Sequence, residues 1–434
     1  KYKLNQLYFK DTQFANLMTR RIFNVLLIAN PYDAFMLEDD GRIDEKIFNE
    51  YTSLSLRYPP RFSQVSTEEE ALALLASMTF DLVICMPGTG DNDSFDIGRH
   101  IKSLYEHIPI VILTPFSHGI TARIADEDLS AFDYVFCWLG NTDLLVSIIK
   151  LIEDKMNLEH DVAEVGVLQD ELVQLILLVE DGIRFYSSVL PNLYKFVLKQ
   201  SQEFSTEALN AHQRTLRMRG RPKIVLARTY EVAITLYEKY KNNILGVITD
   251  VRFPRVERGE KDGLAGIKLC AAIRKEDPFV PLIIQSSESE NSSYAAKYGA
   301  SFIDKNSKKM DVDLRRIVSD NFGFGDFVFR NPETGEEIAR VRNLKELQNI
   351  LFAVPAESFL YHISRNHVSR WLYSRAMFPV AEFLKPITWN SLQDVDAHRR
   401  IIFEAIVKYR KMKNQGVVAV FKRDRFDRYS NFAR

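Results

Sequence analysis

The stretch Ile244-Leu245-Gly246-Val247-Ile248-Thr249-Asp250 decides the fold class of this chain. Its apolar run is typical of a buried strand in a parallel sheet, and it ends in a carboxylate. Open α/β folds bind their ligands at this carboxyl edge. Three other apolar runs also end in polar side chains: 175–179 before Glu180-Asp181, 281–285 before Ser286, and 300–304 before Lys305. Three acids, a hydroxyl and an amine are therefore expected at one edge of one sheet.

This set of groups suits phosphoryl transfer to a carboxylate. Clustered carboxylates repel one another, and Mg²⁺ is a cation that such oxygen ligands hold. Its predicted ligands are Glu180, Asp181 and Asp250, with the carbonyl of Arg252. Asp250 would be the nucleophile and would form an aspartyl-phosphate. Lys305 would stabilise charge on the transferring group, and Ser286 would hydrogen-bond the bound phosphoryl group.

These motifs carry a resemblance to a known family. Residues 172–322 resemble a receiver domain of bacterial two-component response regulators. The matching segments are Glu180-Asp181, Asp250-Val251-Arg252-Phe253-Pro254, Asp262-Gly263-Leu264, Ser286, and Phe302 with Lys305. The resemblance implies Mg²⁺-dependent phosphorylation of Asp250 by a histidine kinase or a small phosphodonor. The alternative is a Rossmann-like sheet with acidic strand ends and no phosphorylation.

The segment departs from the family pattern at three places. Asn306 follows the lysine where the family has proline. The charged stretch 255–261 makes the loop after Pro254 longer than usual, and it lies near the expected site. Residues 208–219 predict an extra helix in a lengthened first crossover, whose basic end is a partner-docking face or a solvated helix face.

The first half of the chain repeats the pattern of the second. The corresponding apolar runs are 24–29, 80–85, 109–114 and 133–137. The chemistry is missing, because Asn30-Pro31, Met86 and Cys137 stand where the second half has Glu180-Asp181, Asp250 and Lys305, and only Thr114 persists. Residues 1–156 are therefore expected to form a pseudo-receiver without a metal site. Asp33 or the acidic run 38–40 is the alternative source of metal ligands, and a solvated loop is preferred.

The prediction is thus an α/β protein with two tandem doubly wound, parallel five-stranded sheets of the flavodoxin-like receiver type, followed by a smaller α+β domain. Residues 157–171 are expected to be a linker, 172–322 the receiver domain, and 323–434 the α+β domain. Within the last domain, a hairpin should flank the turn 331–335. Helices should cover 343–354, with Asn343 as N-cap, 356–377 and 395–413, and a final strand 417–421.

Composition limits the classes of partner. The 434 residues are 46% hydrophobic with a formal net charge of −1, which gives no electrostatic case for nucleic acid or membrane binding. Three cysteines are too few and scattered for a disulfide framework or a zinc site. No apolar run is long enough for a membrane span, and a reducing cytoplasm fits.

Two features of the last domain invite a functional interpretation. His362 and His367 are five residues apart, so they are not expected to share a helix face as zinc-binding pairs do, and structural roles are favoured. A basic segment begins at residue 395, with eleven Lys or Arg against four Asp or Glu. It lacks the aromatic spacing of a single-strand binder, and we find no helix-turn-helix spacing.

The order of the three domains is similar to the amino-terminal regulatory region of bacterial phosphoenolpyruvate synthase/pyruvate phosphate dikinase-like proteins. The residues that carry this likeness are 323–329, 357–362, Asn366 and His367. The resemblance implies a control segment that passes a phosphorylation signal to an attached catalytic domain or a partner, with homodimerisation as an open possibility. The alternatives are an unphosphorylated scaffold or dimerisation module, and a phosphotransferase that uses His362 or His367.

Overall fold

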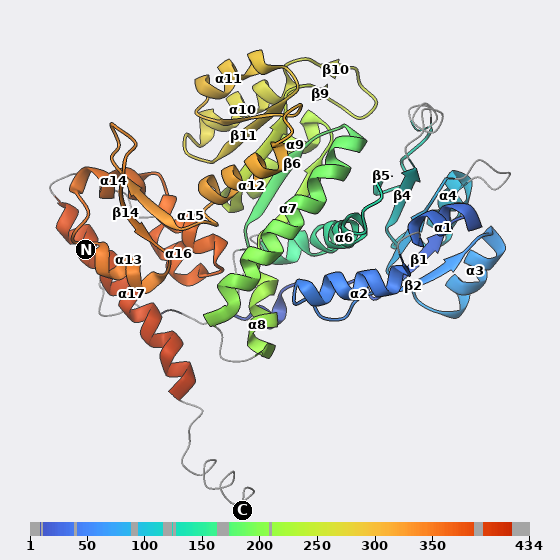
Figure 1. The fold of residues 1–434 in the computed structure, drawn as a ribbon, viewed down its shortest axis with the longest axis horizontal. Helices are drawn as coiled ribbons and strands as arrows, with labels where there is room; N and C mark the ends of the chain where they lie inside the picture. Colours follow the sequence, from blue (N-terminus) through green and yellow to red (C-terminus); the bar gives the residue numbers. More distant parts are fainter. Residues whose placement is uncertain are drawn as a thin grey trace, which may run out of the picture.

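Three structural units follow one another along an elongated molecule (Figure 1). A computed structural model describes residues 9, 12–38, 41–87, 94–115, 124, 127–162, 173–207, 211–385 and 394–418. The first unit lies at one end of the molecule, the second in the middle, and the third at the other end.

The first unit is a parallel sheet with strand order β2-β1-β3-β4-β5. Its strands are β1 (Asn24–Ile28), β2 (Arg61–Val65), β3 (Leu82–Cys85), β4 (Ile110–Pro115) and β5 (Tyr134–Trp138). Its helices are α1 (Pro31–Glu38), α2 (Ile43–Ser53), α3 (Glu68–Ser77), α4 (Ser94–Leu104) and α6 (Asp143–Val162). This 2-1-3-4-5 order is the flavodoxin-like, doubly wound arrangement.

The second unit repeats this topology in the order β12-β11-β8-β6-β7. Its parallel strands are β6 (Leu175–Val179), β7 (Lys223–Ala227), β8 (Ile244–Asp250), β11 (Leu282–Ser286) and β12 (Ser301–Asp304). Its helices are α7 (Ile183–Phe204), α8 (Ala211–Arg217), α9 (Tyr230–Tyr240), α10 (Ala265–Glu276), α11 (Ser292–Lys297) and α12 (Met310–Asn321). A short antiparallel pair, β9 (Phe253–Pro254) and β10 (Lys261–Asp262), follows β8. The two expected tandem sheets are therefore confirmed.

Local sequence explains these elements. All five residues of β6 are buried, as expected for a central strand that helices cover on both faces. Thr229 starts α9 because its hydroxyl accepts a hydrogen bond from the Val232 N–H, and Thr67 caps α3 in the same way. The chain thus alternates buried strands with capped helices, and each strand ends at the same edge of its sheet.

Helix α7 joins the first two units. It packs beside α6 and against β5, the edge strand of the first sheet. The edge is capped, because the Cys137 N–H donates to Ser187 Oγ at 2.9 Å and the Tyr186 hydroxyl donates to the Val135 carbonyl. Side chains of both sheets belong to one continuous hydrophobic core along α6 and α7.

The third unit confirms the expected hairpin and differs in its helices. Strands β13 (Phe327–Arg330) and β14 (Glu337–Val341) pair antiparallel, and Asn343 caps α13 (Leu344–Ile350) by accepting from the Glu346 N–H. The single helix predicted for 356–377 is wrong. Helices α14 (Ala356–Ser364) and α15 (His367–Ser374) replace it, because Asn366 adopts a left-handed φ of 58° that a helix cannot continue through. Helices α16 (Phe378–Leu384) and α17 (Val395–Val418) complete the unit.

Three further predictions need correction or limits. Helix α6 continues to Val162, so the start of the expected linker is helical, and residues 163–171 lie outside the described residues. The extra helix in the crossover ends at Arg217, before the predicted end, and a 3-10 turn over Met218–Gly220 follows it, while residues 208–210 lie outside the described residues. The final strand is wrong at Val417 and Val418, which end α17, because helical context overrides the strand preference of valine. Residues 419–421 lie outside the described residues.

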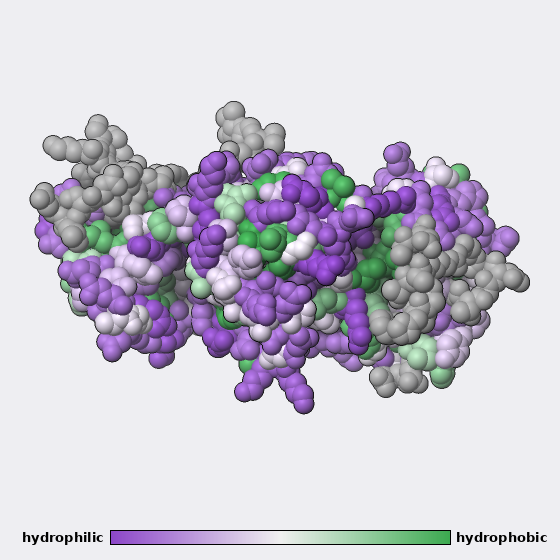
Figure 2. Space-filling view, turned by 90° about the horizontal axis from the view of Figure 1, so that it is seen from above, coloured by the Kyte–Doolittle hydropathy of each residue, from purple (hydrophilic) through white to green (hydrophobic). Residues whose placement is uncertain are grey.

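The surface seen from above is mainly hydrophilic, with small hydrophobic patches (Figure 2). Among the described helices, none combines the length and the apolar character needed to cross a bilayer.

Candidate functional site

The carboxyl edge of the second sheet gathers the side chains singled out from the sequence. Parallel registers align Val179 with Thr249, Asp250 with Gln285, and Ser286 with Asp304. The chain positions directly after β6 and β12 belong to Glu180-Asp181 and Lys305. Neighbouring strands of a parallel sheet thus carry residues distant in sequence to one edge.

Lys305 forms the electrostatic centre of this edge. Its Nζ lies 2.6 Å from Glu180 Oε2 and 2.7 Å from Asp250 Oδ1. The same ammonium lies 4.0 Å from the centroid of the Phe185 ring, at the start of α7. All three charged side chains are largely buried, so these ion pairs are weakly screened.

The carboxylates are close enough to share a cation. One oxygen from each of Glu180, Asp181 and Asp250 lies within 4.8 Å of the other two. In the described parts of the chain, this is the one group of three or more such ligands. An all-carboxylate oxygen set suits a hard divalent cation such as Mg²⁺. The backbone N–H of Arg252 lies 3.4 Å from Asp250 Oδ2, and the structure records no contact of the Arg252 carbonyl with the cluster.

Glu180 is the most perturbed acid of the cluster. Burial raises its pKa to about 7, although Lys305 acts in the opposite direction, and the nearby Asp250 raises it further. Its Oε1 also accepts a hydrogen bond from the Gly182 N–H at 2.9 Å. A carboxyl group that titrates near neutrality at a strand end is typical of a functional site.

Ser286 lies at the same edge but is engaged elsewhere. Its hydroxyl oxygen accepts hydrogen bonds from the Glu288 N–H at 3.0 Å and from Asn291 Nδ2 at 2.9 Å. Its backbone carbonyl accepts from the Lys305 N–H at 2.9 Å. The structure records no contact between the Ser286 side chain and Asp250.

A second lysine reaches the acids, and the sequence did not single it out as a site residue. Lys261, on β10, places its Nζ 2.7 Å from Asp181 Oδ2. The loop between β9 and β10 also contacts the first unit, where Arg258 forms an ion pair with Asp128 at 2.9 Å. The sequence feature that could have identified Lys261 is the unusual length and charge of the segment 255–261, next to the predicted nucleophile.

Among its described residues, the corresponding edge of the first sheet lacks this constellation. Asn30 donates from Nδ2 to Asp33 Oδ2 at 2.7 Å, and Asp33 is buried in α1. The Thr114 hydroxyl donates to the carbonyl of Pro115. Burial raises the pKa of the Cys137 thiol. The expected correspondence of Cys137 with Lys305 is one residue off, because Cys137 pairs with Thr114 as Asp304 pairs with Ser286, so Trp138 takes the position of Lys305. Residues 39 and 40 lie outside the described residues.

His362 and His367 of the third unit meet although they lie on two different helices. The break at Asn366 turns α15 back, so that the two Nδ1 atoms of His362 and His367 are 2.9 Å apart. His362 Nε2 accepts from the Arg330 N–H. Burial lowers the pKa of His362 to about 4 and of His367 to about 3. Both are neutral, packed histidines that support the β13 end of the hairpin.

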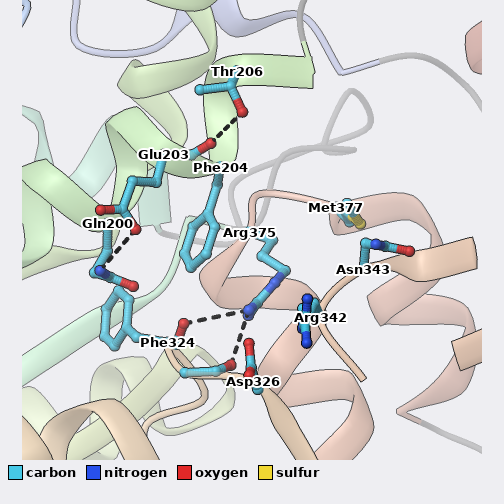
Figure 3. Close-up of a pocket in the computed structure, with 11 residues that line it drawn as sticks. Gln200, Glu203, Phe204, Thr206, Phe324, Asp326, Arg342, Asn343, Arg375 and Met377 are labelled. Carbon is cyan, nitrogen blue, oxygen red and sulfur yellow. Dashed lines mark hydrogen bonds between the residues drawn. The ribbon is translucent and has the colours of Figure 1, made fainter. Parts of the chain in front are cut away.

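A cavity of about 260 Å³ lies between α7 and the third unit (Figure 3). The Arg375 guanidinium forms part of its wall and donates to the carbonyls of Gly323, Phe324 and Gly325. Through these bonds the Arg375 guanidinium fixes residues 323–325, which connect the second and third units. The cavity contains none of the acids described above.

Comparisons with known proteins identify no family for this chain. No protein-family model matches it, and no curated protein does. Two solved response regulator/GGDEF domain proteins of two-component systems match 68% of this chain and 96% of theirs, at 14% and 15% identity and a TM-score of 0.28. NtrX from Brucella abortus, solved with ADP, matches 89% of this chain and 80% of its own at 9% identity and a TM-score of 0.25. The fold assignment depends on the strand order and registers given above and takes nothing from these likenesses.

Proposed function

We propose that this chain is a regulatory signalling region that accepts a phosphoryl group on Asp250 and transmits the change to an attached or partner protein. The observation that carries the proposal is the bridge from Lys305 to both Glu180 and Asp250, beside a third carboxylate. This arrangement combines a nucleophile, a fixed cation and oxygen ligands for Mg²⁺ at the ligand-binding edge of the fold.

The chain's own groups account for the chemistry. An Asp250 carboxylate oxygen would attack the phosphorus of the donor, while the bond from phosphorus to the leaving group breaks and that group departs with the electron pair. Lys305 would stay beside the phosphoryl oxygens and offset their added charge. When bound by Glu180, Asp181 and Asp250, Mg²⁺ would supply charge neutralisation for the transferring group.

The same geometry suggests how the change would be transmitted. The phosphoryl group adds negative charge and strong acceptors, so the Ser286 O–H would donate a hydrogen bond to it, while the Ser286 oxygen still accepts from the Glu288 N–H and from Asn291 Nδ2. A shift of Ser286 towards the phosphoryl group would, through these two bonds, move the segment after β11 and, beside it, Phe302 on β12. The readout would be a shift between two arrangements of this surface.

The proposal for Asp250 also suggests a role for each of the other parts of the chain. Residues 1–156 would form a pseudo-receiver that is not phosphorylated, 157–171 a linker, and 323–434 an output unit. We propose a phosphoenolpyruvate synthase/pyruvate phosphate dikinase-like enzyme as the recipient of the signal, supported by the resemblance of residues 323–329, 357–362, Asn366 and His367. The donor would be a histidine kinase or a small phosphodonor, and the location the cytoplasm.

The test is direct phosphorylation. Incubation with acetyl phosphate and Mg²⁺ should add one phosphoryl group, detected by intact mass and mapped to Asp250. Asp250→Asn should accept none, while Asp304→Asn, the neighbouring strand-end acid, should accept the group normally. An unchanged wild-type mass, or a phosphorylated Asp250→Asn protein, would refute the assignment.

The second candidate is an unphosphorylated scaffold or dimerisation module. The observation that favours it is the continuous core shared by the two sheets, which makes them one rigid platform. A beryllofluoride mimic of the phosphoryl group discriminates between the two. The scaffold predicts an unchanged oligomeric state and partner affinity, whereas the signalling region predicts a change in at least one.

A further inference from the structure

A small cavity between the first two units has five cationic side chains and one carboxylate among its thirteen lining residues. Its volume is about 60 Å³, and it lies where the start of the first sheet, the segment after α2, helix α6 and the 3-10 turn after α8 meet. Figure 1 shows α2, α6 and α8 grouped in the middle of the molecule. Its charged lining residues are Arg21, Arg57, Lys150, Glu153, Arg219 and Arg221.

Two of these cations are already neutralised. Lys150 Nζ lies 2.7 Å from Glu153 Oε2. Arg221 Nη2 lies 2.7 Å from Asp154 Oδ1, and both side chains of this pair are buried. Glu153 is the one carboxylate among the lining residues, so these pairs leave no acid for the remaining arginines.

Three guanidinium groups remain without a carboxylate partner among the described residues. Arg57 is exposed and forms no hydrogen bond there through its side chain. Arg21 uses only Nε, which donates to the Met18 carbonyl at 3.3 Å. Arg219 donates from Nη1 to the Ala15 carbonyl at 2.9 Å, while its Nε is buried without a partner. Burial and the charge of Arg21 lower the pKa of Arg219, and the opposing effects of Tyr58 and Asp161 are smaller.

The backbone that carries these groups is strained. Met18, Ser55 and Tyr58 all line the cavity, and their φ angles are 51°, 53° and 59°. They are three of six non-glycine residues with positive φ in the described parts of the chain. Such conformations cost about 1–3 kcal/mol each and gather at functional sites. Backbone strain and positive charge without a paired carboxylate thus coincide at this cavity.

We propose that this cavity binds a phosphoryl dianion, either as inorganic phosphate or as the terminal group of a small phosphomonoester. The forked donors of guanidinium groups match tetrahedral oxyanions and give strong charge-assisted hydrogen bonds. A bound anion would contact Arg57 of the first unit and Arg219 of the second, and would clamp the two units together. The site is separate from Asp250 and does not depend on phosphorylation there.

The proposal is tested by calorimetry with inorganic phosphate, without Mg²⁺, against chloride at equal ionic strength. Glycerol phosphate in a second arm distinguishes a free ion from a monoester, and the tighter ligand identifies the source. The wild type should bind phosphate with one site. Arg57→Gln should weaken binding about tenfold, since one charge-assisted hydrogen bond contributes about 1.5 kcal/mol or more. Arg57 forms no other hydrogen bond in the described structure, so this variant should fold normally.

Two further variants make the result specific. Arg219→Gln should also weaken binding, and it should remain folded by circular dichroism. Arg214→Gln, an exposed arginine on α8 that does not line the cavity, should bind as the wild type does. Absence of phosphate and glycerol phosphate binding to the wild type, or equal losses in Arg57→Gln and Arg214→Gln, would overturn the proposal. Retained phosphate binding by Asp250→Asn would show that this site is independent of the phosphoryl acceptor.

Discussion

At the residue scale, Gly266 lets the start of α10 pack closely against the backbone of the proposed nucleophile, Asp250. A Cβ atom on Gly266 would lie 1.8 Å from the Asp250 carbonyl oxygen, which is backbone and cannot rotate away. We therefore expect Gly266→Ala to destabilise the protein by about 2–3 kcal/mol and to reduce phosphoryl acceptance. Urea unfolding measures the first effect and intact mass the second.

The matched control for this prediction is nearby. A Cβ atom on Gly263 would meet nothing within 4 Å, so Gly263→Ala should change stability by no more than about 0.5 kcal/mol. Similar losses in both variants would show that the close approach at Gly266 is not what limits the site.

The histidine pair predicts a pH dependence of stability. Both pKa values fall on folding, to about 4 for His362 and about 3 for His367. The unfolded chain therefore binds protons below about pH 6.5 that the folded chain does not, and stability falls as the pH is lowered towards 4. We expect a loss of about 2 kcal/mol per histidine between about pH 6.5 and about pH 4.5, measured by urea unfolding.

Two variants test whether the buried histidines cause this pH dependence of stability. His367→Asn should flatten the profile, whereas His212→Gln, which changes an exposed histidine on α8, should leave it as in the wild type. A profile that keeps its slope in His367→Asn would contradict the assignment.

At the element scale, the hairpin of β9 and β10 places a lysine where it competes with a cation. Lys261 pairs with Asp181 Oδ2, so its ammonium competes with Mg²⁺ for the charge of that carboxylate. Exposed ion pairs contribute about 0.2–1 kcal/mol, which predicts that Lys261→Met binds Mg²⁺ about two- to fivefold more tightly. Calorimetric titration with Mg²⁺ measures the change. Lys241→Met, which breaks the exposed pair with Glu276, is the control and should bind as the wild type does. Unchanged or weaker binding by Lys261→Met would contradict competition.

At the scale of the whole molecule, buried ion pairs connect the first two units. Lys223 on β7 is fully buried, and its Nζ lies 2.7 Å from Asp161 Oδ2 on α6. Replacing Lys223 by methionine would leave Asp161 buried without its cation. The expected cost is about 3–5 kcal/mol. Because the two sheets share a core, urea unfolding should remain one cooperative transition that shifts as a whole.

An exposed pair that also involves α6 serves as the control. Lys239 and Glu159 are 2.6 Å apart at the surface, so Lys239→Met should cost no more than about 1 kcal/mol. Two separate wild-type transitions, with only one shifted in Lys223→Met, would show that the units fold independently.

Sequence alone determined the two parallel sheets, the strand-end residues and the loss of acids in the first half. These features follow from short apolar runs and the residues directly after them, and both signals are local. Strand β2 gave a weaker signal, because only Val65 among its five residues is buried at the edge of the first sheet. A valine pair near residue 417 suggested a strand for the same local reason, although the helix α17 continues through it.

Tertiary structure alone decided which distant groups meet away from the strand ends. The contact of Lys261 with Asp181, the meeting of His362 with His367 through a left-handed Asn366, and the gathering of Arg21, Arg57 and Arg219 depend on where loops and units lie. Periodicity describes which face of an element is buried, whereas these contacts join elements whose relative placement is set by packing of the whole chain. For that reason the strand-end chemistry could be inferred in advance and the basic cavity could not.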